Sequence, residues 1–72
     1  MPEYAQTWRK KLRLKVLVDI AKDELELGRE INQVYHTLEE EMKMRWKLVY
    51  STRRQYLNDI NKILTNQYVL VI

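Results

Sequence analysis

The sequence ELELGREINQVYHTLEEEMKMRW, residues 24–46, spans the end of one helical pattern and the start of a second. Gly28 lies between two helical patterns, and glycine often follows a helix C-terminus because it adopts a positive φ without a Cβ clash. After it, apolar residues recur at steps of three and four, as in an amphipathic α-helix. The sequence therefore predicts a helix over residues 4–27, a turn at 28–32 and a second helix from residue 31. The alternative is that Gly28 lies inside one continuous helix, at a cost of about 1 kcal/mol relative to alanine.

The apolar stripe after Gly28 continues almost to the end of the chain. Its steps run four, three, four and repeat, which requires about 3.67 residues per turn, close to a straight α-helix. This predicts one helix over residues 31–67, with only Arg53 breaking the stripe, and an apolar C-terminal tail at 68–72 that packs on its own molecule or on a dimer mate. The stripe comprises Ile31, Tyr35, Leu38, Met42, Trp46, Val49, Arg53, Leu57, Ile60, Leu64, Tyr68 and Val71, flanked by Val34, Leu48, Tyr56 and Ile63.

Two short polar motifs mark places where this helix would break instead. Thr37 with Glu40, and Thr52 with Gln55, each have the spacing of a capping box, in which two side chains bond the first backbone N–H groups of a helix. A break near Ser51 and Thr52 gives a three-helix arrangement. Because the apolar stripe runs through both motifs, the all-α helical hairpin of two long antiparallel helices is the preferred prediction.

The small size of the chain indicates that its folded state needs stabilisation beyond its own hydrophobic core. It has 72 residues, 46% of them hydrophobic, and no cysteine, so we expect a single helical domain over residues 1–72. Folding of so short a chain buries only about 60% of the surface of the unfolded state. Disulfides and thiolate metal sites are excluded by the lack of cysteine. A partner chain is therefore the expected support.

The first helix has apolar residues on two faces and requires cover on two sides. We expect the second helix of the same chain to cover one face and another molecule to cover the other. The sequence thus predicts a homodimer in which two hairpins form an antiparallel four-helix bundle. The residues assigned to self-association are Leu14, Leu17, Val18, Ala21 and Leu25, together with Leu12, Val16 and Ile20.

The net charge of +3 conceals an uneven distribution. Residues 1–18 carry +4, residues 19–41 carry −6 and residues 42–72 carry +5. A turn at Gly28 gathers the acidic residues at the tip of the hairpin and the basic residues away from it. The basic residues assigned to a candidate nucleic-acid-binding surface are Arg9, Lys10, Lys11, Arg13, Lys15, Lys43, Arg45, Lys47, Arg53 and Arg54.

The basic region has three interpretations. Its cations would neutralise nucleic-acid phosphates while Trp8, Trp46 or Tyr50 stacks on exposed bases. The segment WRKKLRLKVLV, residues 8–18, also has the composition of a helix that lies on an anionic membrane. The preferred interpretation is a solvated face, with ion pairs to the run of glutamates at residues 39–41.

Catalysis has little support in the sequence. The only histidine is His36, and although Glu39 and Glu40 follow it at helical spacing, a second histidine and the Glu-x-x-His motif of di-iron bundles are absent. No serine or threonine is paired with a base in a recognisable motif. We therefore expect a protein that is not an enzyme and has no metal or cofactor.

The preferred function is a small interaction or adaptor module that self-associates and binds another macromolecule, most simply a protein, through a helix face. The alternative is a nucleic-acid-binding regulatory protein that uses the basic end. No apolar run approaches the roughly 20 residues that span a bilayer, and no secretory signal is recognisable. We therefore expect a cytoplasmic protein without a transmembrane segment.

Overall fold

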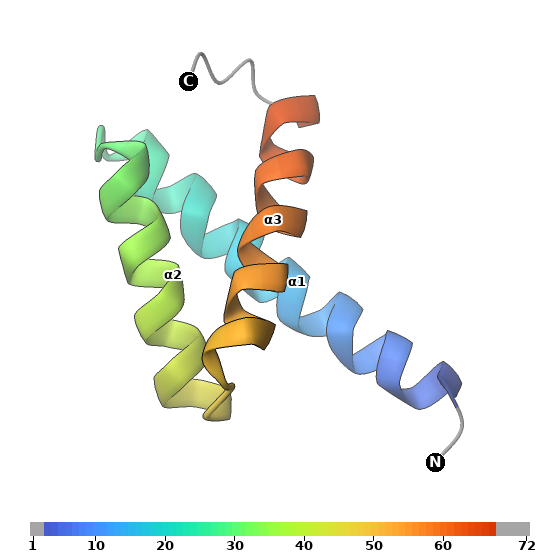
Figure 1. The fold of residues 1–72 in the computed structure, drawn as a ribbon. Helices are drawn as coiled ribbons and strands as arrows, with labels where there is room; N and C mark the ends of the chain where they lie inside the picture. The colour runs from blue at the N-terminus through green and yellow to red at the C-terminus, as the bar shows by residue number, and fades with distance from the viewer. Residues whose placement is uncertain (1–2, 68–72) are drawn as a thin grey trace.

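The computed structural model describes the backbone of residues 3–67 and the side chains of residues 8–66. Three α-helices make up this part of the chain (Figure 1): α1 at Glu3–Glu26, α2 at Ile31–Trp46 and α3 at Tyr50–Gln67. Residues 3–67 contain no strand. The prediction of an all-α protein is confirmed. The apolar tail predicted at residues 68–72 lies outside the described residues.

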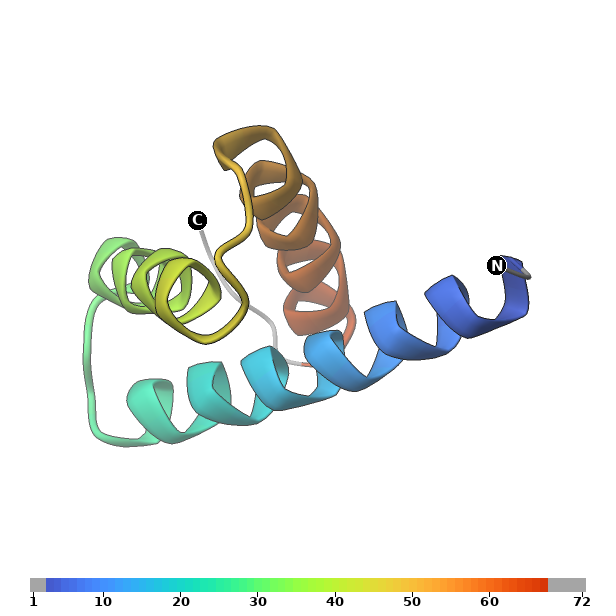
Figure 2. The same cartoon turned by 90° about the horizontal axis from the view of Figure 1, so that it is seen from below.

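The helices α2 and α3 pack on the same side of α1. The view from below shows both above α1, which runs along the whole length of the molecule (Figure 2). The N-terminal turns of α1 extend past α3, so they are not covered by either of the shorter helices (Figures 1 and 2). One side of α1 therefore belongs to the core and the opposite side does not.

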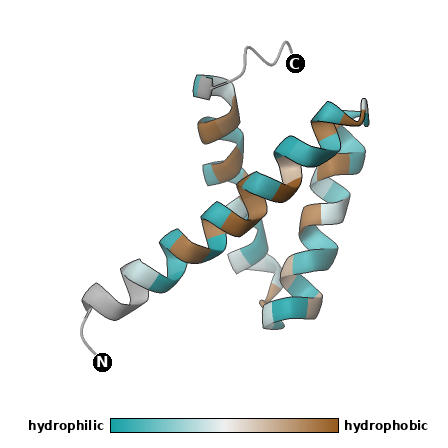
Figure 3. Ribbon diagram, turned by 180° about the vertical axis from the view of Figure 1, so that it is seen from behind, coloured by the Kyte–Doolittle hydropathy of each residue, from teal (hydrophilic) through white to brown (hydrophobic). Residues whose placement is uncertain are grey.

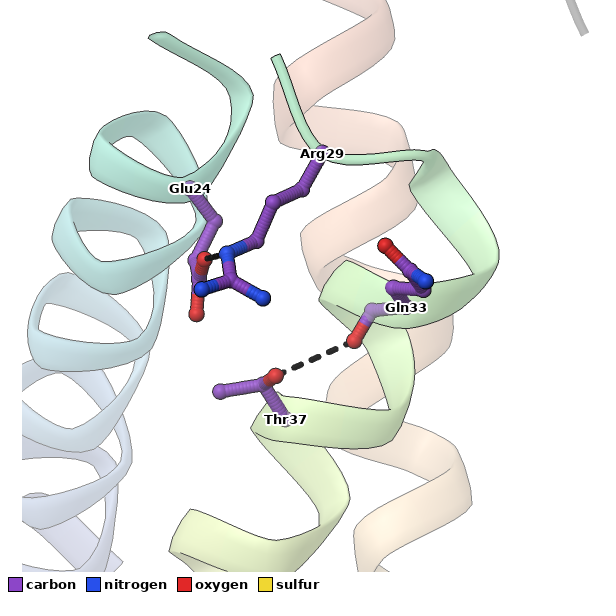
Figure 4. A network of polar contacts seen from close by, with 4 residues as sticks. All are labelled: Glu24, Arg29, Gln33 and Thr37. Carbon is purple, nitrogen blue, oxygen red and sulfur yellow. Dashed lines mark hydrogen bonds and ion pairs between the residues drawn. The ribbon is translucent and has the colours of Figure 1, made fainter. Parts of the chain in front are cut away.

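The predicted turn at Gly28 is present in the structure. Gly28 has a φ of 83°, and its N–H donates to the carbonyl of Leu25 at 3.0 Å. The N–H of Arg29 donates to the carbonyl of Glu24 at 3.2 Å, and the side chains of these two residues form an ion pair (Figure 4). These contacts satisfy the last carbonyls of α1 and reverse the chain toward α2.

The predicted continuous helix over residues 31–67 is wrong, because α2 ends at Trp46 and residues 47–49 are not helical. Lys47 adopts the left-handed conformation, with φ 51° and ψ 39°. Its N–H donates to the carbonyl of Lys43 at 3.0 Å, and the N–H of Leu48 donates to that of Met42 at 3.4 Å. Residues 3–67 therefore form three helices, as in the alternative prediction of a break near Ser51 and Thr52.

The capping boxes do not mark the observed helix starts. The Thr37 hydroxyl lies inside α2 and donates to the carbonyl of Gln33 at 3.1 Å (Figure 4). Thr52 lies in the first turn of α3, after its start at Tyr50. Residues 3–67 of one chain form three helices, so the described parts of two chains would bring six together. The structure therefore does not confirm the predicted four-helix arrangement of two hairpins.

The hydrophobic core lies where the three helices meet. Each helix contributes side chains at steps of three and four, because that spacing keeps them on one face. The break at Lys47 reverses the chain, so the stripe on α2 and the stripe on α3 face the same core instead of extending along one long helix. The buried residues are Leu17, Val18 and Ala21 from α1, Val34, Leu38 and Met42 from α2, and Tyr56, Ile60 and Leu64 from α3.

We expect the substitution Lys47→Gly to stabilise the protein by about 1 kcal/mol, because a side chain in the left-handed region is strained and glycine is not. Urea unfolding would measure the change. Lys43→Gly is the matched control. It places glycine inside α2 and is expected to destabilise by about 1 kcal/mol. A loss of stability in Lys47→Gly would contradict the left-handed end of α2.

Candidate docking groove

A groove lies between α1 and the last turn of α2. Its volume is about 340 Å³. It combines an apolar surface with three cations, which come from both helices. The lining residues are Arg9, Leu12, Arg13 and Val16 from α1, with Arg45 and Trp46 from α2.

The side of α1 that carries the groove is turned away from the core. Leu17 and Ala21 are wholly buried against α2 and α3. Leu12 lies on the other side of the helix and keeps 48% of its surface exposed, and Trp8, one turn earlier, keeps 55%. Val16 continues this row and is half-buried. Large apolar side chains that remain accessible in a row along one helix are typical of a docking surface.

Arg13 and Trp46 hold the two walls of the groove together. The guanidinium carbon of Arg13 lies over the indole ring of Trp46, 5.3 Å from its centroid. A cation–π contact of this kind contributes about 0.5–1 kcal/mol at an exposed site. Trp46 also packs against the hydrophobic core. The contact therefore fixes the end of α2 beside the middle of α1 and keeps a positive charge in the groove.

The three arginines of the groove differ in their partners. Arg45 forms an ion pair with Glu41, one turn earlier on α2, through its Nε atom. Neither Arg9 nor Arg13 forms an ion pair with any residue whose side chain is described. The α1 side of the groove is therefore its more electropositive wall, with two cations that no carboxylate among the side chains of residues 8–66 neutralises.

The structure divides the predicted basic surface into several parts. Lys10 pairs with Asp59 of α3 at 3.0 Å. Arg53 donates to the carbonyl of Leu48 and lies over the ring of Tyr50, at 5.8 Å from its centroid. These two cations are therefore engaged within the fold.

The remaining basic residues lie on separate surfaces. Arg54 donates to the Tyr50 hydroxyl at 3.3 Å. Lys43 and Lys47 are exposed at the end of α2. Lys11 and Lys15 line a second hollow, of about 400 Å³, between α1 and α3. Only Arg9, Arg13 and Arg45 of the predicted set are brought to the groove.

The residues predicted for self-association are also divided. Leu17, Val18 and Ala21 belong to the core of the chain itself, and Leu14, Ile20 and Leu25 pack against it. Leu17, Val18 and Ala21 are therefore occupied within one molecule, whereas Leu14, Ile20 and Leu25 are only half-buried. Leu12 and Val16 line the groove and remain available to a partner.

Tyr35 joins α2 to α3. The Tyr35 hydroxyl donates to Oδ1 of Asn61 at 2.7 Å. Burial raises the pKa of Tyr35 above its ordinary value of 10.0, because removal from water disfavours the phenolate. The folded state therefore retains this proton better than the unfolded state. Its contribution to stability is present below about pH 10 and is lost as the pH rises further.

We expect Tyr35→Phe to lower the free energy of unfolding by about 1 kcal/mol at neutral pH, because the Asn61 side chain loses its hydrogen bond. The variant should also lack the Tyr35 contribution to the loss of stability at alkaline pH. Urea unfolding at neutral and alkaline pH would measure both effects. Tyr50→Phe is the control, since Tyr50 is exposed, and equal effects of the two substitutions would contradict a specific bond to Asn61.

His36 is exposed on α2. No group of three or more histidine, cysteine, aspartate or glutamate side chains suited to a metal ion occurs among the described residues. Within residues 3–67, none of the helices has both the length and the apolar character needed to cross a membrane.

The groove was only partly predictable from the sequence. Arg9, Arg13 and Arg45 were expected in a basic surface and Leu12 and Val16 in a self-association face, but nothing indicated that they share one site. The pairing of Arg13 with Trp46 depends on how α1 and α2 cross, which no local pattern encodes.

No protein-family model, curated protein or solved structure matches this chain.

Proposed function

We propose that the protein is a small non-enzymatic interaction module that binds a helix of another macromolecule in the groove between α1 and α2. The observation that carries the proposal is the exposed row of Leu12 and Val16 beside two arginines with no ion-pair partner in the described structure. An amphipathic helix docks its apolar side chains in such a groove. Carboxylates on that helix would meet Arg9 and Arg13, which sets its orientation.

A labelled helical peptide tests this function directly. The probe carries leucine at every fourth position with aspartate on the flanks, and fluorescence anisotropy follows its binding as the protein is added. We expect binding that weakens with added salt, because the charged rim contributes to it. Leu12→Asp should lose binding at least about tenfold, since it places a carboxylate in the apolar part of the groove.

Two controls define the result. A peptide with lysine in place of aspartate should bind more weakly, because its charges repel the arginines. The substitution Met44→Asp should leave binding unchanged, because Met44 is exposed on α2 and does not line the groove. Equal binding of both peptides, or no effect of Leu12→Asp, would overturn the proposed function.

Nucleic-acid binding is the second candidate, supported by the gathering of Arg9, Arg13 and Arg45 next to Trp46. A single-stranded or duplex oligonucleotide would contact the cations through its phosphates, and its affinity would fall log-linearly with salt. In the same anisotropy assay, an oligonucleotide that binds while the acidic peptide does not would favour this candidate. Absence of oligonucleotide binding at low salt would exclude it.

A further inference from the structure

The accessible side of α1 has an apolar centre. Leu12, Val16 and Ile20 follow one another at steps of four, so they form one row along the helix. Leu12 is exposed, and Val16 and Ile20 are half-buried. The view from behind shows α1 in front of the other two helices, with hydrophobic and hydrophilic residues alternating along it (Figure 3). This side of α1 is open to a partner along much of its length.

The charges on this side of α1 change sign at Val16. Arg9 and Arg13 precede it and line the groove, and Asp23 follows it, whereas Asp19 lines the hollow between α1 and α3. Arg9 and Asp23 are equally distant from Val16 in sequence. Both aspartates are exposed, and neither forms an ion pair with a described side chain.

This side of α1 is therefore complementary in charge to the same side of a second α1 that lies antiparallel to it. A two-fold axis at Val16 places Leu12 opposite Ile20 of the second copy, because both are four residues from the axis. The same axis brings Arg9 close to Asp23 of the second copy. A parallel arrangement would place like charges together, which disfavours it.

We propose that the helix that occupies the groove is α1 of a second copy of this chain, packed antiparallel about Val16. The proposal rests on the proposed function and names its partner, since the part of α1 after Val16 supplies an apolar side chain, Ile20, and a carboxylate, Asp23, to the groove. Each copy presents the same surface to the other, as in an isologous dimer. Asp23 of one α1 then lies against Arg9 of the other, at the rim of the groove.

Two single charge reversals test the antiparallel pairing. Arg9→Glu and Asp23→Arg each place like charges opposite one another at both symmetric positions of the dimer. Neither side chain takes part in an ion pair or side-chain hydrogen bond with a described residue, so the fold should be unaffected. Sedimentation equilibrium at low salt measures the dimer dissociation constant, and circular dichroism checks that each variant is helical.

We expect the wild-type protein to dimerise and each variant alone to dissociate at least about tenfold more readily, since two exposed pairs change from attraction to repulsion. An equimolar mixture of the two variants should dimerise about as well as the wild type, because both pairs in the mixed dimer are attractive again. Lys11→Glu and Glu40→Arg are matched controls for the charge change. Both residues are exposed and outside the row, so both variants should dimerise normally.

Any of three other outcomes overturns the proposal. A wild-type protein that stays monomeric shows that a second copy is not the occupant, while binding of the acidic peptide would leave the proposed function intact. A dimer that tolerates both reversals uses another surface. A mixture that fails to recover excludes antiparallel packing about Val16. If the protein dimerises in the expected way but Leu12→Asp has no effect on peptide binding, the proposed function fails while the dimer stands.

Discussion

We expect the substitution Leu17→Asp to unfold the chain at room temperature. Leu17 is wholly buried where α1 meets the other two helices. No polar or charged residue is buried among those with described side chains, so the new carboxylate would have no partner. An unpaired charge in such a core costs several kcal/mol, and the stability of a chain of this size is about 5 kcal/mol. Loss of the helical circular dichroism signal would confirm the expectation.

Leu12→Asp is the matched control for this experiment. It makes the same chemical change on the same helix, but at a side chain that is 48% exposed. We expect the variant to remain helical, while it loses binding at the groove. A folded Leu17→Asp variant, or an unfolded Leu12→Asp variant, would contradict the assignment of one side of α1 to the core and the other to docking.

The turn between α1 and α2 was predictable because it depends on local chemistry. Gly28 needs a positive φ, and a side chain at this position would be strained. The structure gives Gly28 a φ of 83°. Helical periodicity on both sides was equally informative, since steps of three and four repeat the apolar positions along one face.

The break after Trp46 was not predictable in the same way. Residues 47–49 contain neither glycine nor proline, and lysine is an uncommon residue in the left-handed conformation that Lys47 adopts. The apolar stripe also keeps its spacing across the break, because α2 and α3 face one core. Periodicity reports which residues share a face, but it does not report whether the axis of the helix changes direction.

The docking groove is a second feature that helical periodicity alone could not predict. The two apolar faces of α1 were recognised, yet the sequence did not show which one the chain covers by itself. That distinction arises because α2 and α3 both pack on the side of Leu17 and Ala21. Leu12 and Val16 are left at the groove, where the crossing of α1 and α2 brings Arg45 and Trp46 beside them.

We expect Val34→Ala to lower the free energy of unfolding by about 2 kcal/mol, because it removes two buried carbons and leaves a cavity in the core. Val34 is wholly buried on α2. Val49→Ala makes the same chemical change at a residue that keeps 64% of its surface exposed, and it should alter the stability by less than about 0.5 kcal/mol. The urea midpoint, at unchanged slope, measures both changes.

This pair of substitutions separates the three-helix structure from the continuous helix that the apolar stripe favours. In a continuous helix Val49 belongs to the central stripe and Val34 lies at its flank, so Val49→Ala would be the more costly change. In the three-helix structure Val49 is in the exposed connection between α2 and α3, where it has little packing to lose. A larger effect at Val49 than at Val34 would therefore contradict the break at Lys47, and with it the crossing of α1 and α2 that places Trp46 in the groove.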